Sequence, residues 1–78
     1  MNLHIEMKFQ DFVNSYRIEE FRRRIASQKY RHYTIFGIAT EVGFNSKSTF
    51  NNAFKKFVGI TPQEYKWEIS QKGELGTN

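Results

Sequence analysis

The chain has 78 residues and a net charge of +4, so it can form one small domain, near the lower size limit for a stable hydrophobic core. It has no cysteine, which excludes disulfides, thiolate zinc sites and a catalytic thiol, and its core must draw on eight Phe, four Tyr and one Trp. Residues 17–56 carry nine Lys or Arg and three acids, which favours a polyanionic partner or, equally well, a solvated face of mixed charge.

The chain opens with a short segment and a long helix. Residues 1–7 are too few for a domain, and we interpret them as the end of an element that begins upstream, with a bare extension as the alternative. A helix is predicted from Phe9 to about Ala26, because no Gly or Pro interrupts it and apolar residues recur at helical spacing. Lys8 is a poor N-cap, so we expect the first turn to fray. The apolar positions are Phe9, Phe12, Val13, Tyr16, Ile18, Phe21 and Ile25.

Three arginines at positions 22–24 lie near the C-terminus of this helix. Positive charge suits the negative end of the helix dipole, and that role alone would explain them. Because three adjacent arginines point in three directions, one or two could instead contact phosphate groups. We expect the three side chains to divide between these uses.

A polar connection at residues 27–33 leads to a second, short helix. Thr34 can cap that helix, whose apolar residues share one face. Gly37 costs up to about 1 kcal/mol relative to Ala inside a helix, so we expect a close neighbouring backbone there. Gly43 supplies the left-handed conformation that ends the helix and turns the chain. The apolar face consists of Ile35, Ile38, Ala39 and Val42.

A third helix is predicted from the cap at Ser46 to about Val58, and it ends at Gly59. Its apolar residues fall on one arc, which must be the buried side. That arc consists of Phe50, Ala53, Phe54 and Phe57. The residues opposite are Ser48, Asn52 and Lys55, with Lys47 and Asn51 on one shoulder and Thr49 and Lys56 on the other. The two helices and their glycine turn have the layout of a helix-turn-helix that reads DNA.

Residues 46–58 contain no Asp or Glu, unlike most exposed helices. A helix that enters the major groove needs short or flexible hydrogen-bonding groups, and it must avoid negative charge because phosphates would repel it. Asn can bridge the edge of adenine, Lys can meet guanine, and Ser or Thr can reach several bases. Simple solvation is the alternative, but Asn51 and Asn52 are mediocre helix formers, so their placement together favours DNA reading.

The last predicted helix begins at a strong capping pattern. Thr61 is its N-cap, Pro62 takes the first helical position, and Glu64 completes a capping box. We expect this helix to close the domain at about residue 70 and residues 71–78 to form a frayed tail.

Several kinds of chemistry have no support in the sequence. No apolar run approaches the length of a membrane span, and no signal-peptide pattern opens the chain, so we expect a cytoplasmic protein without a membrane partner. His4 and His32 have no carboxylate or second histidine at ligand spacing, so no metal site is expected. No paired-carboxylate, Ser/His/Asp or phosphate-loop pattern indicates an enzyme, and no cofactor is expected.

The run from Ile38 to Lys66 resembles the second helix-turn-helix of the AraC/XylS family of bacterial transcription regulators. Residues 12–25, FVNSYRIEEFRRRI, are similar to the long linker helix of that family. The matching positions in the helix-turn-helix are Ile38, Ala39, Val42, Gly43, Phe44, Ser46, Phe50, Phe54, Lys55, Gly59, Thr61, Pro62 and Tyr65. The resemblance implies an all-α fold in which a linker helix joins two helix-turn-helix subdomains that read successive major-groove segments of double-stranded DNA.

The resemblance also implies roles for individual residues. The residues nearest the bases would be Lys47, Ser48, Asn51 and Asn52. Those nearer the phosphate backbone would be Ser46, Thr49 and Lys55, and Arg17 matches the arginine of the linker helix. Members of the family are usually activators that also contact RNA polymerase, which is therefore an expected partner.

The sequence departs from the family pattern at its N-terminal end. The first helix-turn-helix and any sensor domain are missing, Glu6 stands where Gly is common, and Lys8 stands where a Ser or Asn cap is usual. We therefore expect a fragment of a larger regulator. Leu3, Phe9, Phe12 and Tyr16 would then lack apolar neighbours, and the exposed patch could drive formation of a homodimer.

We predict an all-α chain with a homeodomain-like helix-turn-helix. Residues 1–7 would be the remnant of a first helix-turn-helix, 8–33 the linker helix and connection, 34–70 the second helix-turn-helix with its closing helix, and 71–78 the tail. The predicted function is sequence-specific binding of double-stranded DNA in transcription regulation. The alternative is a helical protein-interaction or homodimerisation module that does not bind DNA.

Overall fold

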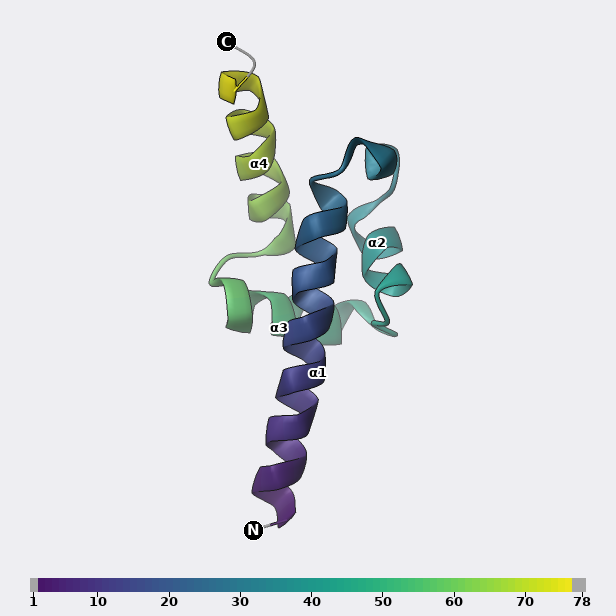
Figure 1. Cartoon of the computed structure of the whole chain (residues 1–78), viewed down its shortest axis with the longest axis vertical. Coiled ribbons are helices and arrows are strands. Elements are labelled where there is room, and N and C mark those ends of the chain that lie inside the picture. The colour runs from purple at the N-terminus through teal and green to yellow at the C-terminus, as the bar shows by residue number, and fades with distance from the viewer. Residues whose placement is uncertain (1, 77–78) are drawn as a thin grey trace.

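The computed structural model describes the backbone of residues 2–76 and the side chains of residues 9–71. Every regular element in residues 2–76 is a helix, and none is a strand, which confirms the all-α prediction (Figure 1). The elements are α1 (Asn2–Ile25), the 3-10 helix η1 (Gln28–Tyr30), α2 (Ile35–Glu41), α3 (Lys47–Val58) and α4 (Pro62–Gly76).

Helix α1 is longer than predicted. It runs without a break from Asn2 through Lys8 to Ile25, so it begins before Phe9, where the sequence predicted its start. The first residues include neither Gly nor Pro, so the helical hydrogen-bond ladder extends through them and Lys8 does not have to act as a cap. The side chains of Leu3 and Glu6 lie outside the described residues, and the interpretation of residues 1–7 as a remnant stays a prediction.

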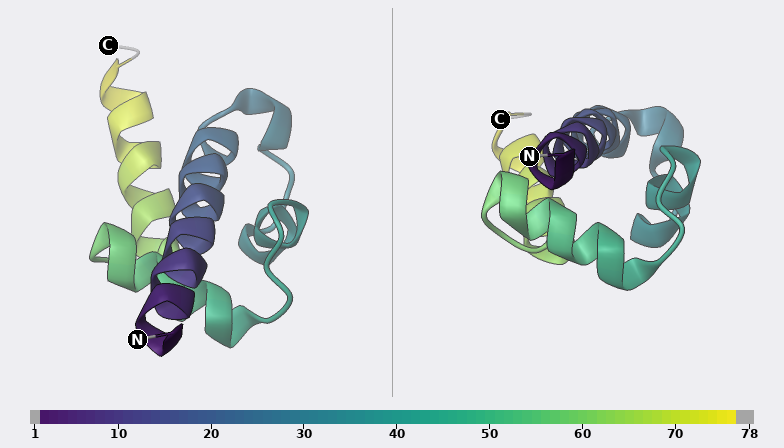
Figure 2. Two further views of the ribbon diagram at one scale, coloured as in Figure 1. Left: turned by 60° about the horizontal axis from the view of Figure 1, so that its bottom comes forward. Right: turned by 90° about the horizontal axis from the view of Figure 1, so that it is seen from below.

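The helices are arranged around a crossing of α1 and α3. Figure 2 shows α3 lying across α1, with α2 near one end of α3 and α4 near the other. The N-terminal half of α1 extends to one side of this crossing, and α4 extends to the other side together with the C-terminal half of α1 (Figure 1). The molecule is therefore elongated, with dimensions of 52 × 20 × 17 Å.

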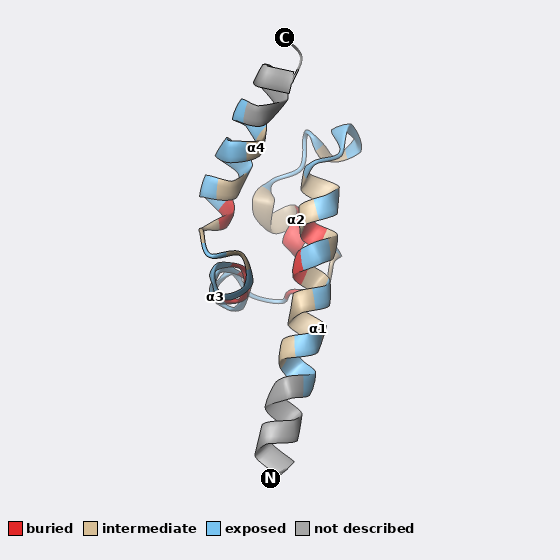
Figure 3. Ribbon diagram, turned by 60° about the vertical axis from the view of Figure 1, so that its left-hand side comes forward, coloured by how far each residue is buried: buried red, intermediate tan, exposed pale blue. Residues whose placement is uncertain are grey.

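The core lies where the C-terminal half of α1 meets α2 and α3 (Figure 3). Its rings pack at angles: the centroid of Phe21 lies 4.8 Å from that of Phe50 and 5.5 Å from that of Phe54. Such tilted and edge-on pairs contribute about 0.5–1.5 kcal/mol each beyond their buried area. The buried apolar residues are Ile18, Phe21, Ile38, Ala39, Phe44, Phe50, Ala53 and Phe54.

Phe57 does not belong to this core, although the helical arc predicted it to be buried. Its exposed fraction is 39%, against 0% for Phe54 one turn earlier. Helix α3 extends past α1 at its C-terminal end, so the arc no longer faces a neighbouring helix there (Figure 1). Val58 packs partly against the core instead, and the Lys56 ammonium lies 5.5 Å from the centroid of the Phe57 ring.

The N-terminal half of α1 carries exposed aromatic residues. Phe9, Phe12 and Tyr16 have exposed fractions of 66%, 69% and 64%, as the sequence led us to expect for a helix without apolar neighbours at this end. These positions fall on one side of the helix, because residues three and four apart share a face.

Helix α4 starts as predicted and ends later. The Thr61 N–H donates to Glu64 Oε1 at 3.0 Å and the Glu64 N–H donates to Thr61 Oγ1 at 3.1 Å, which is the reciprocal capping box. The hydrogen bond from the Thr61 backbone lowers the pKa of the Glu64 carboxyl. The helix continues to Gly76, beyond the predicted end at about residue 70, and fraying of residues 71–78 stays a prediction. A well-capped start and good helix formers after residue 70 outweigh the cost of Gly73.

Candidate nucleic-acid interface

The orientation of α3 is fixed from both ends. At its N-terminus, Ser46 Oγ accepts a hydrogen bond from the Thr49 N–H at 3.1 Å and donates one to Thr49 Oγ1 at 2.9 Å. At its C-terminus, Gly59 adopts φ +96° and its N–H donates to the Lys55 carbonyl at 2.9 Å. With Phe50, Ala53 and Phe54 held in the core between these caps, the opposite side of α3 must face outward.

The turn that leads into α3 depends on Gly43, whose φ is +118°. The Phe44 N–H donates to the Ala39 carbonyl at 3.0 Å, and the buried Phe44 ring closes the corner against Phe50, 5.3 Å away between centroids. A Cβ on Gly43 would lie only 2.8 Å from Arg17 Nε. The positive φ angle confirms the predicted role of Gly43, and a side chain at this position would also have to displace the end of the Arg17 side chain.

Gly37 has a different neighbour from the one predicted. A Cβ there would lie 2.9 Å from Thr34 Oγ1 and 3.9 Å from Tyr33 Cδ2, both of which are side-chain atoms. That hydroxyl caps α2 by accepting a hydrogen bond from the Gly37 N–H at 2.9 Å. The expectation of a close neighbouring backbone is therefore wrong, and the glycine leaves room for the helix cap.

All but one of the predicted DNA-contacting side chains lie exposed on or beside α3. The exposed residues are Ser46, Lys47, Ser48, Thr49, Asn51, Asn52 and Lys55. Arg17 differs, since it is half-buried and its guanidinium lies 5.9 Å from the centroid of Phe44. The structure thus places Arg17 against the turn that precedes α3, where it supports the helix-turn-helix.

A concave surface lies along the Lys47 side of α3, and the hollow that it forms has a volume of about 690 Å³. From α3 it is lined by Lys47, Phe50, Asn51, Asn52 and Lys55. From the first turn of α2 and its cap it is lined by Thr34, Ile35 and Phe36, and from the start of α4 by Thr61, Pro62 and Gln63. The sequence reasoning missed Thr34 and Gln63 as candidates, because only the packing of three helices brings the two helix starts to the same hollow.

The arginines at 22–24 are held by acids and by a tyrosine. Arg22 Nη1 lies 2.9 Å from Glu19 Oε2, and its Nε donates to the Tyr65 hydroxyl at 3.4 Å. The hydrogen bond to Tyr65 raises the pKa of the Arg22 guanidinium. These contacts connect α1 with α4 and leave Arg22 in a structural role.

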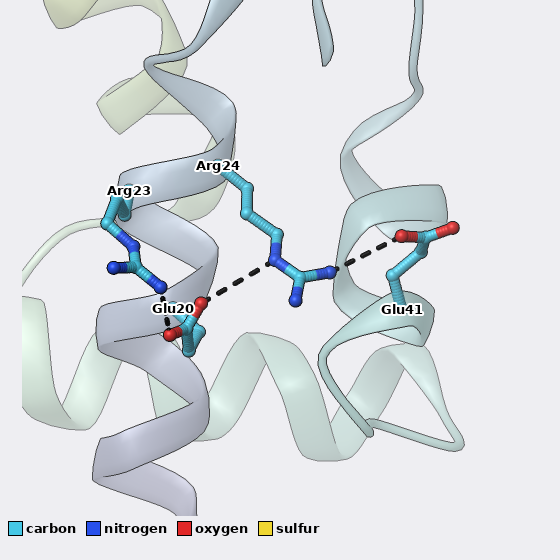
Figure 4. Close-up of polar contacts among 4 residues, drawn as sticks. All are labelled: Glu20, Arg23, Arg24 and Glu41. Carbon is cyan, nitrogen blue, oxygen red and sulfur yellow. Dashed lines mark hydrogen bonds and ion pairs between the residues drawn. The ribbon is translucent and has the colours of Figure 1, made fainter. Parts of the chain in front are cut away.

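The other two arginines share a carboxylate, as Figure 4 shows. Arg23 pairs with Glu20, and this hydrogen bond lowers the pKa of the Glu20 carboxyl and raises that of Arg23. Arg24 lies 3.6 Å from the same carboxylate and 3.3 Å from Glu41 Oε1, so it connects α1 with α2. Each of the three arginines has an acidic partner, although the prediction assigned one or two of them to phosphate groups.

The other Lys and Arg side chains of residues 17–56 lie outside this arginine run. Lys56 pairs with Asp11, its Nζ lying 3.0 Å from Oδ1. Within the described side chains, the other five cations of residues 17–56 have no carboxylate within 4.0 Å. They are Arg17, Lys29, Arg31, Lys47 and Lys55. The unpaired positive charge thus lies on α3, on α1 beside the turn that precedes α3, and on the connection around η1.

No group of three or more His, Asp or Glu side chains among residues 9–71 is arranged to hold a metal ion. None of the described helices is both long enough and apolar enough to cross a membrane.

Comparison with known proteins identifies the fold that this geometry indicates. A family model described as a helix-turn-helix domain matches residues 1–67. The chain belongs to the AraC-type helix-turn-helix family. The resemblance predicted from the sequence is confirmed, together with DNA binding and transcription regulation at the level of the family.

The curated relatives are transcription and response regulators. The chain is 32% identical over 62 residues to the transcriptional regulatory protein HptR of Staphylococcus aureus. It is 34% identical over 62 residues to an uncharacterized response regulatory protein of Staphylococcus epidermidis. Each alignment covers 80% of this chain and 23% of the relative, so the chain spans about a quarter of the length of the relatives it matches. Comparison with solved structures gives no significant match.

Proposed function

We propose that α3 enters the major groove of double-stranded DNA and reads base edges with its exposed face. The observation that carries this proposal is the division of α3 into two sides. One side is anchored by Phe50 and Phe54, and the other presents amides, hydroxyls and two unpaired lysines without a single acid. A groove lined by base edges and phosphates fits such a surface, since it offers donors and acceptors to the amides and negative charge to the lysines.

The proposed roles follow from the placement of each side chain. Lys47, Ser48, Asn51 and Asn52 would face the bases, and Lys55 would contact phosphate. Ser46 and Thr49 bond to each other at the start of the helix, so they would present the first amides of α3 to a phosphate rather than act through free hydroxyls. Arg17 remains a predicted phosphate contact, now from beside the turn.

The test compares Asn52→Ala with Lys55→Ala on a duplex selected from a random pool and on a scrambled duplex. Asn52→Ala should weaken binding of the selected duplex by about 1–3 kcal/mol, or roughly 5- to 150-fold, and change binding of the scrambled duplex little. Lys55→Ala should weaken both equally and reduce the log–log salt slope by about 0.9. If both variants had equal effects on the two duplexes, the assigned roles would be wrong.

The wider setting of this chain is also part of the proposal. The relatives are named as regulators, and the matched segment is only 23% of their length, which supports a role as the DNA-reading part of a larger bacterial regulator. Such a role would be carried out in the cytoplasm. Contact with RNA polymerase and activation of transcription stay predictions from the family resemblance.

A second candidate function is self-association through α1. It is favoured by the three exposed aromatic side chains Phe9, Phe12 and Tyr16, which form an apolar stripe on one face. The two functions respond differently to salt. DNA binding should fall steeply as salt rises, whereas a homodimer held by this stripe should persist in sedimentation experiments at high salt.

A further inference from the structure

The connection between α1 and α2 carries positive charge that the helix-turn-helix itself does not use. Lys29 and Arg31 are both exposed, and neither has a carboxylate within 4.0 Å among the described side chains. The chain has no acid between Glu20 and Glu41, so this positive charge has no neutralising residue nearby in the sequence.

The connection is held in one conformation although it lies on the surface. The Ser27 N–H donates to the Arg24 carbonyl at 3.0 Å, the Tyr30 N–H to the Ser27 carbonyl at 3.1 Å, and the Arg31 N–H to the Gln28 carbonyl at 3.2 Å. Ser27 Oγ also accepts from the Lys29 N–H at 3.2 Å. The backbone that carries the two cations is therefore ordered before any partner binds, which lowers the entropic cost of binding.

Aromatic contacts anchor the same connection to the rest of the molecule. The half-buried Tyr30 packs against the core, and its ring centroid lies 4.8 Å from that of Tyr33. The Arg24 guanidinium lies 5.8 Å from the centroid of Tyr30. Lys29 and Arg31 flank this anchored tyrosine in the sequence, so they project from a fixed base.

The connection ends at the edge of the concave surface beside α3. Thr34 lines that surface, and Arg31 is three residues earlier, so their Cα atoms are at most about 11 Å apart. An arginine side chain adds several ångströms of reach. Double-stranded DNA carries a negative charge about every 1.7 Å along its axis, so a duplex seated on α3 would offer phosphates to a side chain of this reach.

We propose that Lys29 and Arg31 contact the phosphates of DNA that flanks the segment read by α3, on the α2 side. This proposal rests on the proposed function, because it needs α3 to be seated in a groove. The two cations would extend the footprint of the domain without adding base contacts, and they would raise affinity for every flanking sequence alike.

The test uses three duplexes that share the segment selected by the wild-type chain. One contains that segment alone, and each of the others extends it by half a helical turn on one side. The wild type should bind one extended duplex more tightly than the short one, with a log–log salt slope steeper by about 1.8 for two phosphate contacts. The double variant Lys29→Gln/Arg31→Gln should bind the short duplex like the wild type and lose the whole gain on the extended one.

Arg23→Gln is the charge control, because it also removes a positive charge, but from a side chain on α1 that is paired with Glu20. It should keep the gain on the extended duplex. Thermal unfolding checks that the variants fold equally well. The flanking contact would be overturned if the wild type bound all three duplexes with equal affinity. It would also be overturned if the double variant lost as much affinity for the short duplex as for the extended one. Failure of the wild type to bind any duplex would instead refute the proposed function.

Discussion

Gly43 and Gly59 offer a matched pair of substitutions that separates backbone strain from packing. Both glycines have positive φ angles, +118° and +96°. A Cβ on Gly59 would meet nothing within 4 Å, whereas a Cβ on Gly43 would lie 2.8 Å from Arg17 Nε and 3.3 Å from Arg17 Cζ. Alanine at either position carries the backbone cost, but only Gly43→Ala also displaces Arg17.

The two costs can be given magnitudes. A left-handed conformation costs an L-residue about 1–2 kcal/mol, so Gly59→Ala should destabilise the domain by about that amount. At Gly43 the arginine can move, because its guanidinium is the end of a flexible side chain, but it would give up its contact with the Phe44 ring 5.9 Å away. A cation–π contact at a partly exposed site contributes about 0.5–1 kcal/mol. Gly43→Ala should therefore cost about 1.5–3 kcal/mol.

Urea unfolding of the two single variants, of Arg17→Ala and of the double variant Gly43→Ala/Arg17→Ala measures these terms. In the absence of the arginine, Gly43→Ala should cost about 0.5–1 kcal/mol less than in its presence. If the cost of Gly43→Ala were the same in both backgrounds, the close approach of Arg17 to this turn would contribute nothing to stability, and the reasoning would be refuted.

Two further predictions concern the core and the last helix. Phe54→Ala should cost about 3–5 kcal/mol, because Phe54 is fully buried and packs against three other rings, whereas Phe57→Ala should cost about 1 kcal/mol. Urea unfolding compares them, and similar losses would contradict the placement of Phe57 outside the core. The pKa of Glu64 is lowered from its ordinary 4.5 in the folded state, so its contribution to stability is present above that pH and is lost as the pH falls through the folded-state pKa. Glu64→Gln should make the melting temperature depend less on pH in this acid range. An unchanged pH dependence would exclude a role for the carboxylate charge.

Features governed by neighbouring residues could be predicted from the sequence. The capping box at Thr61 and Glu64 needs only two side chains three positions apart, and the structure contains both of its hydrogen bonds. Gly43 and Gly59 stand where the chain must leave a helix, and both have positive φ angles. The division of α3 into a buried and an exposed side likewise follows from helical spacing, and the AraC-type family could be recognised from the positions that these features occupy.

Features that depend on which elements meet could not be predicted in this way. Helical spacing places Phe57 with Phe54, but only the crossing angle of α1 and α3 determines that α1 no longer covers Phe57. Gly37 signals a lack of space, yet its neighbour is the Thr34 hydroxyl of its own helix cap rather than a second backbone. The acidic partner of Arg24 on α2 is seventeen residues away in the sequence, so no local pattern reveals the pair.

The pairing of acids with the arginine run also determines where the positive charge of the domain remains available. Glu41 ends α2, close in the sequence to the helix that would enter DNA, and an unpaired carboxylate there would repel phosphates. Its contact with Arg24 holds it toward α1, at the cost of one cation that could have bound DNA. Because both side chains are partly exposed, this pair contributes no more than about 1 kcal/mol to stability. Its larger effect is electrostatic, since it keeps negative charge away from the face on which Lys47 and Lys55 remain unpaired.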